Sequence, residues 1–169
     1  MQENAVVIVS KEREAVLYLA EDAPRAVRIA CTNFLTDLNK ICGCPARMTH
    51  DAREANVLVG VIGEDAAVDA LAEARYGALK EEGVLRWEAY VQTLLPDGRL
   101  VVAGNGRRGA VYGVYDLSRR FGVSPWYFFA DVPVKKRRCV SLPAGYCKTD
   151  WPCVQYRGIF LNDEEELDA

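Results

Sequence analysis

The residues with the clearest chemical potential lie in a glycine-rich segment, GNGRRG at 104–109. It follows an apolar run and precedes a helical pattern, and Asp131 lies 22 residues after its last glycine. This spacing is typical of a dinucleotide-binding loop, in which backbone N–H groups hold a pyrophosphate. That loop requires a parallel βαβ unit, whereas the preceding run is predicted to be half of an antiparallel hairpin. We therefore favour a structural interpretation, in which the glycines permit a tight strand-to-helix turn.

Two arginines inside this loop, Arg107 and Arg108, are candidates for binding an anion. A guanidinium can hold a carboxylate through two parallel hydrogen bonds. Loop arginines more often form ion pairs with a neighbouring domain or contact solvent, and this is the interpretation that we favour. Both interpretations stay open from the residues alone.

Near the end of the chain, Asn162, Asp163 and Glu164 open an acidic stretch after the apolar run 156–161. An acidic end is most often a solvated tail. Carboxylates can also bind sugar hydroxyls or activate water, and inverting glycosidases need an acid and a base on opposite sides of the scissile bond. No second carboxylate can be paired with these residues from the sequence, so the catalytic residues remain unknown.

The run Trp126-Tyr127-Phe128-Phe129 can offer a face on which sugars stack, but consecutive aromatic residues more often pack beneath a domain interface. The basic run at 135–138 is expected to be a solvated loop rather than an anion site.

Cysteine and histidine residues give little support for a metal site. The chain has six cysteines, no C-x-x-C pair, and His50 as its only histidine, so we predict no metal and no cofactor. Cys31 lies on an apolar helical face and is expected to be buried. Cys147 and Cys153 flank a loop and can pair only in an oxidising compartment, so free thiols are expected.

Composition restricts the class of protein. With 169 residues, 50% hydrophobic and 27% charged, the chain has room for one core with appendages. Its net charge of −3 provides no domain-wide positive field for nucleic acid. No apolar run approaches the roughly 20 residues that cross a bilayer, so a membrane partner is not expected. A secretory signal is not visible, which slightly favours the cytoplasm without determining the compartment.

Hydrophobic periodicity predicts an α+β domain with a mixed sheet. The first two strands are expected to form an opening hairpin, the helix at 24–42 to be capped by Asp22 and ended by Gly43, and Gly113 to pack closely on the sheet. The stretch 124–132 is expected to be extended and 143–153 to be a linker. Strands are predicted at 5–9, 16–20, 46–50, 56–62 (buried on both faces), 87–95 (half-buried) and 99–103, and helices at 24–42, 64–76 and from the glycine loop to 121.

Two longer motifs carry a family resemblance. VVAGNGRRGAVYGVYDLSRRFGVSPWYFFADVPV at 101–134, followed by YRGIFLNDEE at 156–165, resembles the N-terminal domain of glycoside hydrolase family 115 (GH115), the xylan α-1,2-glucuronidases. The chain departs from that family at Arg107, where lysine is usual, at Phe128 and Phe129, where tryptophans are usual, and in the short region 72–86.

The resemblance implies a β-hexosaminidase domain 2-like α/β sandwich over residues 1–150. Residues 151–169 would then hold the first strand, 156–161, of an incomplete catalytic (β/α)₈ barrel. Active sites of such barrels form at the C-terminal ends of the strands, so Asn162, Asp163 and Glu164 would lie at the substrate-binding rim. Arg107 and Arg108 would be further candidates for contact with the substrate carboxylate.

The implied function is that of the N-terminal domain of an inverting α-glucuronidase that removes (4-O-methyl)glucuronic acid from xylan. The implied partners are the missing C-terminal barrel and, through the full-length enzyme, glucuronoxylan-type carbohydrate. The chain alone is expected to be inactive, and family members are often exported. The alternative is a stand-alone carbohydrate- or protein-binding module without catalysis.

Overall fold

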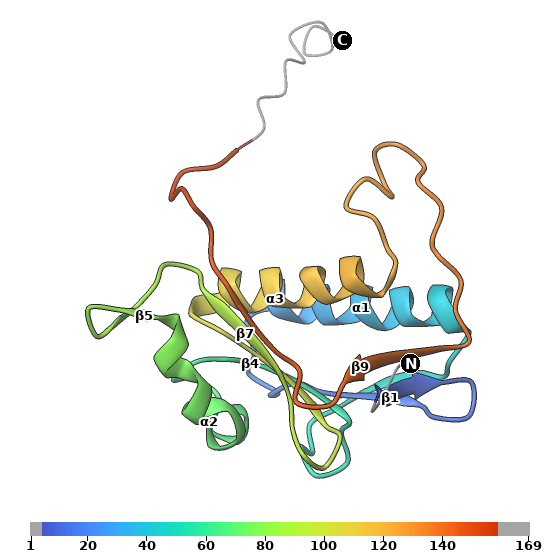
Figure 1. Ribbon diagram of the computed structural model, residues 1–169, viewed down its shortest axis with the longest axis horizontal. Helices are drawn as coiled ribbons and strands as arrows, with labels where there is room; N and C mark the ends of the chain where they lie inside the picture. The colour runs from blue at the N-terminus through green and yellow to red at the C-terminus, as the bar shows by residue number, and fades with distance from the viewer. Residues whose placement is uncertain (1–4, 159–169) are drawn as a thin grey trace, which may run out of the picture.

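The computed structural model describes residues 5–158, which form a twisted six-stranded mixed sheet between two helical layers (Figure 1). Its strands are β2 (Ala15–Tyr18), β3 (Ala46–Thr49), β4 (Val57–Val61), β7 (Tyr90–Leu94), β8 (Leu100–Gly104) and β10 (Cys147–Asp150). They lie in the order β10-β7-β8-β4-β2-β3. Strands β8, β4, β2 and β3 are parallel, and β7 and β10 extend one edge in antiparallel fashion.

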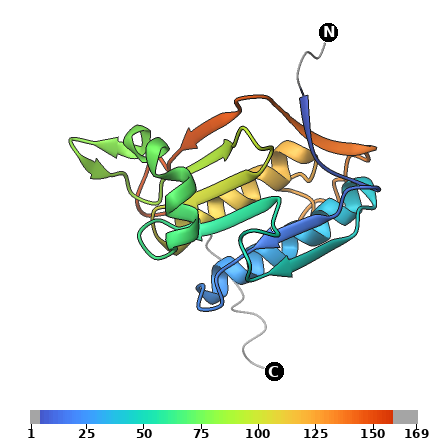
Figure 2. The same ribbon diagram turned by 90° about the horizontal axis from the view of Figure 1, so that it is seen from below.

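One face of this sheet is covered by α1 (Arg25–Cys42) and α3 (Gly106–Phe121), and the other by α2 (Ala66–Ala72) and the 3-10 helix η1 (Glu73–Leu79) (Figures 1 and 2). Alternate strand residues enter opposite cores. Leu17 and Val59 pack on the α1/α3 side, whereas Val16 and Leu58 pack on the α2 side. The predicted mixed sheet with flanking helices is confirmed, although α2 is shorter than the predicted helix at 64–76 and continues as η1.

Helix α1 forms because apolar residues recur every three or four positions and all face the sheet and α3. Phe34 of α1 lies 6.2 Å from Phe121 of α3, measured between ring centroids. Gly43 ends α1 with φ +65, as predicted. The predicted Asp22 cap is wrong, because the helix begins directly after Pro24 and has no side-chain cap.

The predicted opening hairpin is also wrong. Strand β1 (Ala5–Ser10) pairs with β9 (Cys139–Pro143), while β2 lies between β3 and β4 and has no free edge. The Asn56 side chain lies between the two segments, donating to the carbonyl oxygens of Ile8 and Glu14 and accepting from the Val16 amide. The Asn56 side chain therefore connects the end of β1 to the start of β2, which are not paired with each other.

The predicted hairpin of β7 and β8 is confirmed, and Gly98 has the positive φ that its turn requires. The half-buried pattern predicted for 87–95 is wrong within β7, because all five of its residues are buried. Helix α3 covers one face of β7, η1 lies against the other, and β10 pairs with its outer edge. The segment between η1 and β7 forms a small hairpin of β5 (Lys80–Glu81) and β6 (Val84–Leu85).

Two segments project on the α1/α3 side of the sheet: the aromatic loop, residues 124–130, and the C-terminal segment, residues 151–158 (Figure 1). The stretch predicted to be extended folds into turns instead, with the Tyr127 amide donating to Ser124 and the Ala130 amide to Trp126. The predicted linker at 143–153 is wrong where it contributes β10 to the sheet.

The predicted barrel strand at 156–161 begins within the described residues, where 156–158 have no regular secondary structure. Its remainder lies outside the described residues, together with Asn162, Asp163 and Glu164. The domain boundary at 150 therefore stays a prediction. No helix in the described part of the chain has the length and apolarity needed to cross a membrane.

Candidate functional site

The glycine-rich loop places the start of α3 directly against the sheet. A Cβ at Gly104 would lie 1.9 Å from the Ala110 nitrogen, and one at Gly109 would lie 2.6 Å from the Ala89 carbonyl oxygen. These distances are shorter than real Cβ contacts allow, so both positions require glycine. The interpretation of a tight strand-to-helix turn is therefore confirmed. Gly113 also packs on the sheet as predicted, since its Cβ would lie 2.7 Å from Val102.

The same loop is poorly suited to a dinucleotide. Strand β8 is parallel to β4, but it is also hydrogen-bonded to β7 in an antiparallel ladder. The buried carboxylate of Glu88 lies beside the start of α3, 3.0 Å from Arg108 Nη1. An anionic side chain in this position repels a pyrophosphate.

Arg107 and Arg108 have different surroundings. Arg107 is exposed and takes part in none of the ion pairs among residues 5–158. Arg108 is half exposed and pairs with Glu88. Arg108 thus forms an ion pair within the domain, whereas the predicted ion pair with a neighbouring domain and the contact of either arginine with a substrate stay predictions.

Glu88, Tyr112 and Arg157 complete a polar cluster around Arg108 that sequence reasoning missed. The Arg157 guanidinium donates to the Glu88 carboxylate and, at 2.9 Å, to the Tyr112 hydroxyl. Glu88 and Arg157 are 69 residues apart, and no periodicity joins them. The one available signal was the position of Arg157 inside the YRGIF motif.

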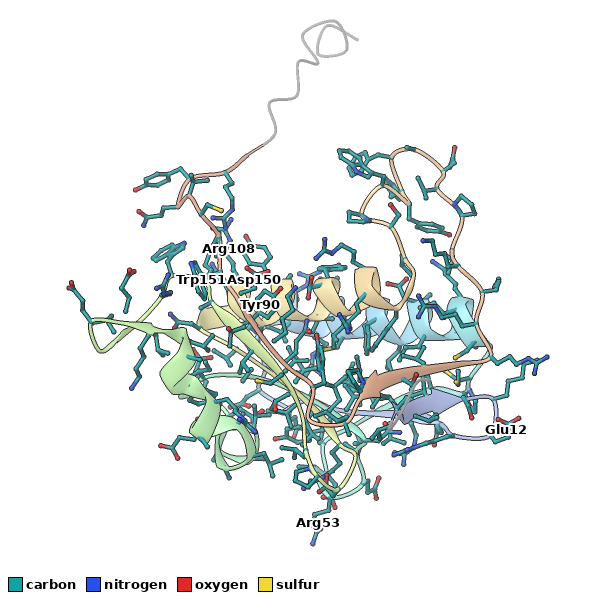
Figure 3. The ribbon with its side chains drawn as sticks, in the orientation of Figure 1. Glu12, Arg53, Tyr90, Arg108, Asp150 and Trp151 are labelled. Carbon is teal, nitrogen blue, oxygen red and sulfur yellow. The ribbon has the colours of Figure 1, made fainter. Side chains whose placement is uncertain are left out.

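A second polar network lies below this cluster, along the edge formed by β7 and β10 (Figure 3). Lys148 donates to Asp116 at 2.6 Å and also pairs with Asp150 at 3.4 Å. The fully buried Gln92 donates to Asp116 at 2.9 Å. Burial alone would raise the pKa of Asp116, but hydrogen bonds from Lys148 and Arg119 outweigh it and hold this pKa below its usual value.

A groove of about 680 Å³ lies between the outer faces of α1 and α3 and the aromatic loop. Its lining combines polar helix residues with the apolar side chains of Tyr127, Phe128 and Phe129. Lys40 lies 4.5 Å from the centre of the Tyr127 ring. Asp37 is buried in the groove, and burial raises the pKa of its carboxyl.

The aromatic residues of this loop are strongly exposed: Trp126 by 65%, Phe128 by 83% and Phe129 by 74%. Contiguous exposed apolar side chains of this kind mark surfaces that contact another molecule or domain. The aromatic loop is therefore a candidate interaction surface.

The described residues contain no group of three or more His, Cys, Asp or Glu side chains that could hold a metal ion. The Nδ1 atom of His50 lies 2.6 Å from the Leu19 carbonyl oxygen. Cys31 is buried in the core as expected, and its thiol pKa is raised to about 12 by burial. Cys147 and Cys153 are both exposed free thiols.

Neither a scan of protein-family models nor a search of curated proteins gives a match. Solved structures do match. One is a GH115 4-O-methyl-α-glucuronidase, BtGH115A, with specificity for decorated arabinogalactans: 31% identity, TM-score 0.79, over 90% of this chain and 19% of that chain. Another is CpGH84D, with 17% identity and a TM-score of 0.52 over 70% of this chain and 19% of that chain, a likeness of fold alone.

The chain thus spans about a fifth of the length of either structure. It is therefore a glycoside hydrolase-like domain with the fold of a GH115 N-terminal domain, as the resemblance in its sequence predicts.

Proposed function

We propose that this chain is the N-terminal domain of an α-glucuronidase-like enzyme that removes (4-O-methyl)glucuronic acid from glucuronoxylan. In this proposal a following (β/α)₈ barrel carries catalysis, and Asn162, Asp163 and Glu164 contribute to its rim. The main support is the 31% identity with a GH115 4-O-methyl-α-glucuronidase over 90% of the chain. That enzyme acts on decorated arabinogalactans, so both polysaccharides belong in the test.

The proposed partner of the groove and the aromatic loop is the barrel. Two observations support this assignment. Phe128 and Phe129 are exposed, and the C-terminal segment leaves the sheet on the same side as the aromatic loop (Figure 1). A domain that follows residue 158 would thus begin on the same side of the sheet as this apolar surface and would be able to cover it.

The chain alone is expected to be inactive, because an inverting mechanism needs two carboxylates and, apart from Asp37 in the groove, the carboxylates of its interior are engaged in structural roles. Asp65 caps α2 by accepting from the Ala67 and Val68 amides, Glu88 pairs with two arginines, and Asp116 pairs with Lys148. Among residues 5–158, none of these is free to act as the acid or base of an inverting mechanism.

The test compares two proteins, the 169-residue chain and the product of the complete coding sequence. Each is incubated with glucuronoxylan oligosaccharides and with decorated arabinogalactan, and released glucuronic acid is measured. We expect release only by the longer protein, with glucuronoxylan as the better substrate. Turnover by the chain alone would contradict its proposed role. A stop codon directly after Ala169 would remove the barrel and overturn the proposal.

A second candidate function, a stand-alone carbohydrate-binding module, is favoured by the exposure of Trp126, Phe128 and Phe129. Titration with xylo-oligosaccharides, followed by tryptophan fluorescence, distinguishes this binding module from the proposed N-terminal domain of an enzyme. We expect no saturable change, because the aromatic loop is proposed to face a protein domain. A saturable change that is lost in Trp126→Ala would instead establish the binding module.

A further inference from the structure

The C-terminal segment is attached to the domain at two points, one on the chain that precedes β7 and one shared between that chain and α3. At its start, the Trp151 ring lies 3.9 Å from the Arg86 guanidinium carbon in a cation–π contact. Near its end, Arg157 bonds to Glu88 and Tyr112. Val154 and Tyr156, between these points, are mostly exposed. The segment is therefore held by its ends and not by burial along its length.

Glu88 is well placed to act as an anchor, because it is itself held firmly. It is only 6% exposed, and its φ of +50 lies in the left-handed region that side chains rarely adopt. The neighbouring residues are fixed by the loop before α3: the Asn105 amide donates to Ala89, and the Asn105 side chain donates to Arg86. Strained backbone of this kind persists only where its surroundings determine it.

The two arginines on Glu88 have different origins. Arg108 belongs to α3 and lies 3.0 Å from the carboxylate, so it fixes Glu88 within the domain. Arg157 is the member of this cluster that comes from the C-terminal segment, and it reaches the other carboxylate oxygen. Its guanidinium also lies over the Tyr112 ring, at 5.4 Å. One buried carboxylate thus ties the C-terminal segment to the beginning of α3.

We propose that Glu88, Arg108, Tyr112 and Arg157 form a latch that sets the direction in which the chain leaves this domain, with Arg157 as its positioning residue. In the full-length enzyme this role rests on the proposed function. Asn162 follows Arg157 by five residues, which span about 18 Å at most. A change of direction at Arg157 would therefore displace the proposed rim residues by ångströms, enough to misalign a reacting group.

The latch is tested first on the 169-residue chain by backbone ¹⁵N relaxation, which does not depend on activity. We expect order parameters for residues 153–158 of about 0.8 in the native chain, and below about 0.6 in Arg157→Met and in Glu88→Gln. Arg157→Lys, which keeps the charge, should recover part of the loss. The double variant should lose no more than either single variant, because both remove the same contact.

The matched control is Arg53→Met. Arg53 also pairs with a carboxylate, Asp51 at 2.7 Å, but it lies on the opposite side of the molecule (Figure 3). It should leave the order parameters of 153–158 unchanged. Native values already below about 0.6, or values that Arg157→Met does not lower, would overturn the latch.

The positioning role is then tested in the full-length enzyme by measuring kcat and KM separately. Arg157→Met should lower kcat about tenfold with little change in KM, while Arg53→Met changes neither, since only the former misorients reacting groups. An unchanged kcat would overturn the positioning role. A full-length protein without glucuronidase activity would refute the proposed function, while the relaxation result would still decide whether the latch exists.

Discussion

The aromatic loop and the C-terminal segment project on the same side of the sheet but are held by opposite means. Arg157 of the C-terminal segment binds the buried carboxylate of Glu88, which also forms an ion pair with Arg108. The aromatic loop leaves Phe128 and Phe129 in water, with only each other as an edge-to-face partner at 5.5 Å. The C-terminal segment therefore has a charged partner within the chain, whereas the aromatic loop has apolar surface left for a partner.

Helix α3 connects these two regions, because its first turn contacts the latch and its last turn leads into the aromatic loop. The two ends of α3 differ in how closely they pack against the rest of the domain. At the latch end, Gly109 brings helix backbone against the backbone of Glu88 and Ala89, just before β7, which leaves no room to adjust. The aromatic end is an open groove.

The largest effect on stability is expected from Gly109→Ala, which places a Cβ 2.6 Å from the Ala89 carbonyl oxygen. Because the obstacle is backbone, the start of α3 must shift, and we expect a loss of about 3 kcal/mol in the free energy of unfolding. Urea denaturation measures this. Gly77→Ala is the matched control, since its Cβ would meet nothing within 4 Å, and it should cost less than about 0.5 kcal/mol. Equal losses in both variants would contradict the close approach.

An intermediate effect on stability is expected when the pH is changed. Its sign is opposite for two carboxylates on the facing helices, Asp116 on α3 and Asp37 on α1. The pKa of Asp116 is lowered in the folded chain, chiefly because hydrogen bonds from Lys148 and Arg119 outweigh burial. Its contribution to stability is therefore present above the unfolded pKa of about 4 and is lost as pH falls below it. Asp116→Asn should lower stability at pH 7 and weaken the loss between pH 4 and pH 2.

Asp37 behaves in the opposite way, because burial raises its pKa in the folded chain. Folding then favours its protonated form, and stability declines as pH rises from about 4 through the folded pKa. Asp37→Asn should remove this decline, so the variant gains relative to the native chain between pH 4 and pH 7. Urea denaturation at pH 3, 5 and 7 compares both variants. The same direction in both would contradict the assigned environments.

The smallest effect on stability is expected from Phe128→Ala, because this side chain is 83% exposed and leaves no cavity when removed. We expect a change within about 0.5 kcal/mol in the isolated chain. In the proposed full-length enzyme the same variant should lower the melting temperature by several degrees if the barrel covers this residue. A loss of more than about 1 kcal/mol in the isolated chain would show that the aromatic loop is part of its own core.

Local patterns predicted much of the fold. The 3–4 spacing of apolar residues and Gly43 located α1, and the Pro96-Asp97-Gly98 turn located the hairpin of β7 and β8. Both the helix and the hairpin depend on residues that lie close together in the sequence. The opening hairpin failed for the converse reason, since β1 pairs with β9 and β2 with β3 and β4, all of which lie far from it in the sequence.

The candidate site was less predictable. The glycine loop and Arg108 were visible as a motif, but Glu88 lay in an ordinary strand pattern, and Arg157 lay in a motif that indicated a family and not an ion pair. An ion pair carries no periodicity, so only the folded chain reveals it. Likewise, β10 lay in a stretch read as a linker, because a short edge strand has too few residues for a pattern.

The α+β class, the main helices and the family resemblance could be inferred without the structure, because amphipathic spacing, turn residues and long ordered motifs are local properties of the chain. The tertiary structure alone decided which strands pair, which arginine of the loop is engaged, and how the C-terminal segment is attached. Those outcomes depend on contacts between residues far apart in sequence, and their energies arise only when burial brings such residues together.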